Sequence, residues 1–218
     1  VLNYYVKEWV DTSKASVTVM DRNHKVIKTF STDSKEDKLE VVKGLNQFVW
    51  NLRYPGAETI EGMILWNGTP SGILAPPGKY YYKLKVAADS AEGEFVVKAD
   101  PNYQCTQEAY EQQFAFLEQC LGKFNEVQKG IKTIRALRNQ LNEFVSKQSQ
   151  ECPKEVKQSA DSLTKKLTLI EEALYQTKSK SGQDVLNFPI RLNDKLSGVF
   201  DAASSGNMAP SRQVQEVY

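Results

Sequence analysis

Apolar and polar residues alternate at a spacing of two through the first hundred residues of the chain. In residues 44–53, Phe48, Trp50 and Leu52 would share one buried face of a strand. Residues 77–86 repeat the pattern, with Tyr80, Tyr82, Leu84 and Val86 set against lysines. Further strands are expected at 2–9, 16–20, 26–30, 62–66 and 92–98. About seven short strands predict an immunoglobulin- or fibronectin-like β-sandwich over residues 1–100.

Turn residues separate these strands. The polar segment 21–25 lies between two β-branched runs and predicts a hairpin, with Asn23 at positive φ. Pro-Gly and Asn-Gly pairs at 55–56, 67–68 and 77–78 mark further turns.

Beyond residue 100 the apolar spacing changes to three and four, which is typical of helices. Helices are expected at about 106–148, with Thr106 as N-cap, at about 153–176 and at about 189–204, and a fourth begins at about 210. The second helix carries a heptad seam at Val156, Ala160, Leu163, Leu167, Ile170 and Leu174. The short connection at 150–153 requires an antiparallel hairpin. Residues 101–218 therefore predict an antiparallel three- to four-helix bundle.

Composition and charge narrow the class of protein. The 218 residues are 40% hydrophobic with a net charge of +1, which gives no general attraction to nucleic acid or to anionic membranes. No apolar run approaches the roughly 20 residues that span a bilayer. The chain opens on strand-like sequence with neither Met nor signal peptide, so we expect it to begin at a cut end of a longer protein.

Residues for catalysis and metal binding are sparse. The three cysteines (105, 120 and 152) form no Cys-x-x-Cys pair, and His24, the one histidine, lies in a predicted turn without an orienting partner. Asp33, Glu36 and Asp37 crowd one polar loop rather than facing each other across a cleft. We therefore expect no catalytic residue, no metal and no cofactor, and interpret Cys120 as a small buried hydrophobe.

Large aromatic side chains are the feature that most suggests a ligand. Trp50, Tyr80 and Tyr82 are expected in the sandwich core. Trp66 precedes the turn at 67–69, where aromatic residues are commoner binding anchors. The candidate ligand-binding residues are Trp66, Tyr54 and Trp9, which would stack on carbohydrate.

The helical seam leaves two alternatives open. Heptads flanked by Lys and Glu most often pack within one bundle. The alternative is a homodimer or another protein partner held by the exposed part of the long helix.

Several longer motifs resemble a known family. Residues 44–56 (Gly-Leu-Asn-Gln-Phe-Val-Trp-Asn-Leu-Arg-Tyr-Pro-Gly), 75–84 and 95–101 are similar to the immunoglobulin-like domain of flagellar hook-capping proteins, and residues 17–30 match its early hairpin. With the helices at 188–196 and 209–218, the chain resembles the C-terminal region of large secreted bacterial proteins. Those proteins carry an N-terminal sialidase-like or sortilin-like β-propeller and are often labelled glycosyl hydrolases.

The resemblance implies that any hydrolase activity belongs to the propeller, since no catalytic residue of the family falls on this chain. It implies a periplasmic or extracellular location and makes the propeller of the same parent chain a partner. Our leading hypothesis is a non-catalytic accessory and interaction module, and the alternative is a carbohydrate-binding module.

Overall fold

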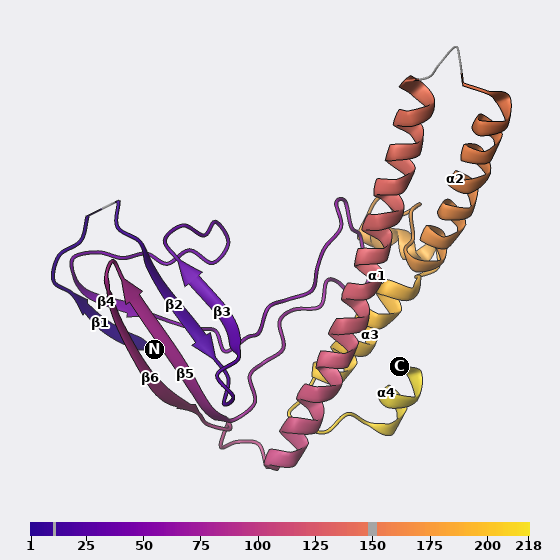
Figure 1. The fold of residues 1–218 in the computed structure, drawn as a ribbon. Coiled ribbons are helices and arrows are strands. Elements are labelled where there is room, and N and C mark those ends of the chain that lie inside the picture. The colour runs from indigo at the N-terminus through magenta and orange to yellow at the C-terminus, as the bar shows by residue number, and fades with distance from the viewer. Residues whose placement is uncertain (11, 148–151) are drawn as a thin grey trace. The chain divides into compact units, whose positions relative to one another are not determined.

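The computed structural model describes residues 1–10, 12–147 and 152–218, and its described chain forms two compact units (Figure 1). The first, called here the β unit, comprises Val1–Pro55, Gly72–Phe114 and Asn207–Ala209. The second, the helical unit, comprises Gly56–Ser71, Ala115–Gly206 and Pro210–Tyr218. The division of the chain into domains at residue 100 stays a prediction.

Six strands make two antiparallel sheets in the β unit. Strand β1 (Leu2–Val6) pairs with β4 (Gly44–Phe48). The second sheet has the order β3-β2-β5-β6, from β3 (Val26–Ser31), β2 (Ala15–Met20), β5 (Gly78–Val86) and β6 (Asp89–Val97). The predicted mixture of antiparallel sheet and helix is confirmed.

Side chains from both sheets share buried clusters. In β2 every second residue is buried, as the alternation predicted: Ala15, Val17 and Val19. One cluster joins Val17 to Val6 of β1. A second contains Trp50 and Tyr80, so their predicted place in the core is confirmed, while Tyr82 is half-buried.

Three local predictions are wrong. Residues 62–66 form no strand, and the described chain has six strands where about seven were expected. Strand β4 ends at Phe48, well short of residue 53, and Leu52 adopts φ 59°, which a regular strand does not allow. The positive φ of the first hairpin falls on His24 (57°) rather than Asn23.

A narrow two-stranded neck, residues 52–55 and 72–75, brackets the segment Gly56–Ser71. The Tyr54 N–H donates to Ile73 O at 2.9 Å and the Ala75 N–H to Leu52 O at 2.7 Å. A Cβ on Gly72 would stand 1.8 Å from Tyr54 O, so only glycine permits this close approach. The segment Gly56–Ser71 therefore leaves the β unit and rejoins it through closely paired backbone.

Helices α1 (Gln107–Lys147), α2 (Lys154–Leu174), α3 (Leu192–Ser204) and α4 (Arg212–Val217) follow, with a short 3-10 helix η1 (Gly182–Leu186). The helices predicted from spacing are confirmed to within about three residues at each end. Thr106 caps α1, because its Oγ1 accepts from the Ala109 N–H at 3.2 Å. The predicted connection at 150–153 lies in part outside the described residues.

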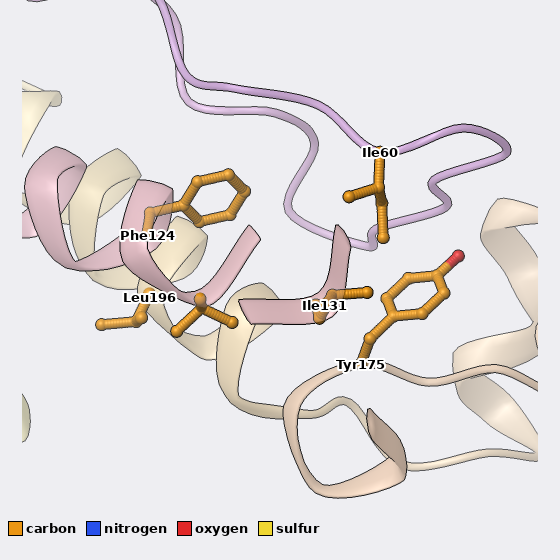
Figure 2. Packing of buried hydrophobic residues seen from close by; sticks show 6 residues of the cluster. Ile60, Phe124, Ile131, Tyr175 and Leu196 are labelled. Carbon is orange, nitrogen blue, oxygen red and sulfur yellow. The ribbon is translucent and has the colours of Figure 1, made fainter. Parts of the chain in front are cut away.

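The core of the helical unit lies where Gly56–Ser71 meets three helices (Figure 2). Ile60 of that segment packs with Phe124 and Ile131 of α1, with Leu196 of α3, and with Tyr175 just beyond α2. Because Phe124 and Ile131 are almost fully buried, this packing fixes the base of the α1–α2 hairpin.

Candidate docking surface on the helical hairpin

A buried ion cluster sets the register between α1 and α2. Glu171 of α2 accepts from Arg135 Nε at 2.7 Å and pairs with Arg138 through its other oxygen. Arg138 also donates to Thr168 Oγ1 at 3.1 Å. Glu171 is only 2% exposed, so the two guanidinium groups of α1 hold it at one fixed height along the hairpin.

This register places apolar residues of the two helices at matching heights. Because the helices are antiparallel, each step forward on α1 corresponds to a step back on α2. Leu137 is therefore level with Ile170, and Phe144 is level with Leu163. Val156 continues the α2 row toward the free end of the hairpin.

Both rows lie on the same side of the hairpin. The residues along which the helices bury each other are spaced three and four apart, and include Ile134 on α1 and Leu167 and Glu171 on α2. The apolar rows lie immediately beside these positions. Equivalent rows of antiparallel helices fall on the same side of the pair. Their exposed fractions are 44% for Leu137, 49% for Phe144, 38% for Val156, 45% for Leu163 and 51% for Ile170.

We call these five residues the apolar face. Its neighbours toward the outer surface of each helix are mostly small or neutral: Ala136 and Gln140 on α1, and Ser159, Ser162 and Ala173 on α2. The charges beside it are Glu143, Lys147, Glu155 and Lys166, two of each sign. Glu143 and Lys147 already pair with each other at 3.8 Å. The face therefore joins apolar surface to a neutral rim.

The opposite side of the hairpin is covered by the segment Gly56–Ser71. Arg135 donates to the Glu61 carbonyl at 3.2 Å. The Glu58 carboxylate lies 3.0 Å from Lys132 Nζ and 3.4 Å from Lys129 Nζ. The hydrogen bond from Lys132 is the main cause that holds the pKa of Glu58 below its ordinary value. The segment Gly56–Ser71 thus covers one side of the hairpin. No described residue of this unit covers the apolar face on the other side.

Trp66, the first ligand candidate, lies on this same segment in the helical unit. Trp66 as a whole residue is 53% exposed, while its backbone N–H donates to Asp194 Oδ2 at 2.9 Å. The N–H of Asn67 donates to the other oxygen at 3.0 Å, so Asp194 fixes the turn that carries the ring. The depression beside Trp66 measures only about 10 Å³, far smaller than a sugar ring requires.

Tyr54 and Trp9, the other two candidates, are half-buried in the β unit. The Tyr54 ring meets Phe114 edge-on at 4.8 Å, and Trp9 packs on the cluster that contains Val6 and Ala15. The two residues belong to different clusters, and Trp66 belongs to the other unit. Within the β unit, Tyr54 and Trp9 therefore belong to separate clusters, and the role of all three residues in binding stays a prediction.

An apolar cavity of about 510 Å³ lies in the β unit. Its lining includes Leu2, Phe48, Trp50 and Phe95, with Lys98 among the few polar members. The volume falls within the range of small-molecule pockets.

The groups considered for catalysis contact other residues rather than one another. His24 is exposed and stacks on Tyr81 with ring centroids 4.0 Å apart. Asp33 pairs with Lys14 at 2.8 Å, and Asp37 with Lys28 at 2.6 Å. Across residues 1–10, 12–147 and 152–218, no three His, Cys, Asp or Glu side chains gather as metal ligands would.

All three cysteines are free thiols. Cys120 is fully buried on α1, and burial raises the pKa of its thiol to about 11, as expected of a small hydrophobe rather than a nucleophile. Cys105 and Cys152 are half-buried.

Sequence reasoning missed the polar residues that organise the helical unit. The sequence patterns single out neither Glu171 nor Asp194, yet both are buried. The signal available for Asp194 is its place in the first turn of α3 beside Asn193, which is also buried. Its partners are more than 120 residues away along the chain, and spacing alone does not identify them.

Comparison with known proteins assigns no family, because no family model, no curated protein and no solved structure matches the chain. Among the described helices, none combines the length and the apolar character that a bilayer crossing needs.

Proposed function

We propose that the chain is a non-catalytic interaction module that docks a helix on the apolar face of the α1–α2 hairpin. The observation that carries the proposal is the pair of level rows, in which four large apolar side chains each keep 44–51% of their surface exposed. Contiguous exposed apolar surface with a polar rim is typical of interaction sites. Helices with residues at this spacing pack on a groove between two others.

In this proposal the two units have different roles. The hairpin presents the apolar face, and the Glu171 cluster with segment Gly56–Ser71 holds it rigid. The β unit, an immunoglobulin-like sandwich in this hypothesis, is the accessory support beside a β-propeller of the same parent chain. A periplasmic or extracellular location belongs to the same hypothesis and is supported by the sequence resemblance alone.

Fluorescence anisotropy with a labelled, neutral leucine-heptad peptide tests helix docking. We expect the chain to bind the peptide, and the variants Phe144→Glu and Leu163→Glu to bind it at least ~10-fold more weakly, because each places a charge in the face. The matched control is Asn139→Glu, which puts the same charge on α1 one turn beyond Arg135, on the side of the hairpin opposite the face. Equal binding by all four proteins, or binding by none, would reject the proposal.

A second candidate function is carbohydrate binding through Trp66. The observation in its favour is that Asp194 fixes the backbone of Trp66 while about half of the residue's surface remains exposed. Rigid exposed aromatic rings are suited to stacking on sugars. Affinity electrophoresis in polysaccharide gels should then show retardation that Trp66→Ala abolishes. Tyr103→Ala, which removes another exposed aromatic ring, is the control.

A further inference from the structure

We infer that the partner of the apolar face is a second copy of this chain, so that two α1–α2 hairpins form a four-helix bundle. The inference rests on the proposed function and names its partner. The self-complementary character, the extent and the charge of the face all support it.

The two apolar rows could pack against the same two rows of a second copy. An isologous interface places the same patch on both partners, so the patch must match itself. Leu137 and Phe144 on α1 are level with Ile170 and Leu163 on α2, which gives two rows with the spacing of an ordinary helix pair. A second hairpin laid on this face would set its own rows into the groove between them. Small neighbours such as Ser159 and Ala173 let the backbones approach closely.

The charge around the face favours self-association over a strongly charged partner. Its rim holds Glu143 and Glu155 against Lys147 and Lys166, so it has no net charge. Two copies therefore do not repel each other across it. An acidic or basic partner would find no excess of opposite charge there. The basic residues of the hairpin lie elsewhere: Arg135 and Arg138, for example, are already paired with Glu171.

The size of the face sets the expected strength. The rows and their neighbours extend over about 18 residues of α2, or roughly 27 Å at 1.5 Å per residue. Two helices about 10 Å apart make the face some 20 Å wide. Each copy would then bury about 500 Å², and the pair about 1,000 Å², which is near the lower limit for a specific interface. A dissociation constant on the order of 10 µM is expected.

Sedimentation equilibrium of the whole chain between about 5 and 500 µM tests the inference directly. We expect a monomer–dimer equilibrium whose dissociation constant rises more than ~30-fold in Leu163→Glu and in Phe144→Glu. These residues lie on different helices, and both are about half exposed in one copy, so circular dichroism should show unchanged folding. Asn139→Glu, on the opposite side of α1, should dimerise as the parent chain does.

The other outcomes overturn the inference in distinguishable ways. A dimer that persists in both variants means that the copies associate through another surface. A monomer over the whole concentration range rejects the second copy as partner. If that monomer still binds the leucine-heptad peptide through the apolar face, helix docking survives with a different partner. If it does not, both proposals fail.

Discussion

The base and the free end of the α1–α2 hairpin carry the same spacing of apolar residues but bury them very differently. At the base, Phe124 and Ile131 are at most 1% exposed because Gly56–Ser71 and α3 cover them. Closer to the free end, and on the uncovered side of the hairpin, Leu137 and Phe144 remain nearly half exposed. Periodicity therefore determines which residues share a side of a helix, and a distant segment determines whether that side is covered.

The largest difference in the free energy of unfolding should appear between a side-chain truncation at the base and one on the apolar face. Ile131→Ala at the base should lower the free energy of unfolding by about 2–5 kcal/mol, because it leaves a cavity in close-packed surroundings. Leu137→Ala at the free end should cost less than about 1 kcal/mol, since water already reaches the side chain. Urea denaturation measured below the dimerisation range is the assay. Equal losses would contradict the contrast in burial.

Removal of the Glu171 carboxylate should have the next largest effect. Glu171→Ala leaves Arg135 and Arg138 facing each other without a counter-charge and should cost about 3 kcal/mol. The control is Glu143→Ala, which breaks an exposed pair with Lys147 and should cost under about 0.5 kcal/mol. Thermal unfolding of the two variants compares them. Similar melting temperatures would mean that the buried cluster does not stabilise the hairpin.

Loss of Asp194 should detach the covering segment rather than unfold the unit. Asp194→Ala removes the acceptors of the Trp66 and Asn67 N–H groups and should cost about 1–3 kcal/mol. Limited proteolysis should then cleave within Gly56–Ser71 much faster than in the parent chain. Asp201→Ala, an exposed change in the same helix, is the control. Unchanged cleavage would show that the segment is held by its apolar contacts alone.

The smallest effect should be a loss of stability at alkaline pH that comes from Cys120 at the base. Burial raises the pKa of this thiol from its ordinary value near 9 to about 11. The thiol therefore binds its proton more tightly in the folded state than in the unfolded state. Its contribution to the free energy of unfolding is complete below pH 9 and is lost as the pH rises to 11. Cys120→Ala should flatten the stability profile in this window. A thiol reagent should label Cys105 and Cys152 but not Cys120 in the folded chain.

Local sequence patterns were sufficient to predict most helices and strands. They did not predict which distant segments pack over those helices and strands. The alternation in Ala15–Met20 and the heptads of Lys154–Leu174 predicted a strand and a helix where they occur. The strand prediction for residues 62–66 was wrong because their apolar run resembles a strand. In the structure the Ile64 N–H donates to Tyr175 Oη at 3.0 Å instead of to a neighbouring strand. Such long-range contacts leave no spacing in the sequence.

The candidate surface was predicted only in part. The α2 seam suggested a partner surface, and three of its residues, Val156, Leu163 and Ile170, do lie on the apolar face. The seam does not reveal that Leu167 turns inward while these three remain outside, because that choice depends on the rotation imposed by the Glu171 cluster. The aromatic candidates depended on residue type alone, which does not distinguish the exposed ring of Trp66 from the half-buried ring of Trp9.

The covering segment also has a consequence for the order of events during synthesis. The ribosome makes Gly56–Ser71 well before Asp194, its anchor 128 residues beyond Trp66. At about 5–20 residues per second, the segment waits roughly 6 to 25 s before the helix that receives it exists. Throughout that interval Ile60 lacks its native packing with Leu196 of α3. Newborn chains should therefore recruit holdase chaperones most strongly in this window, and release them once α3 has emerged.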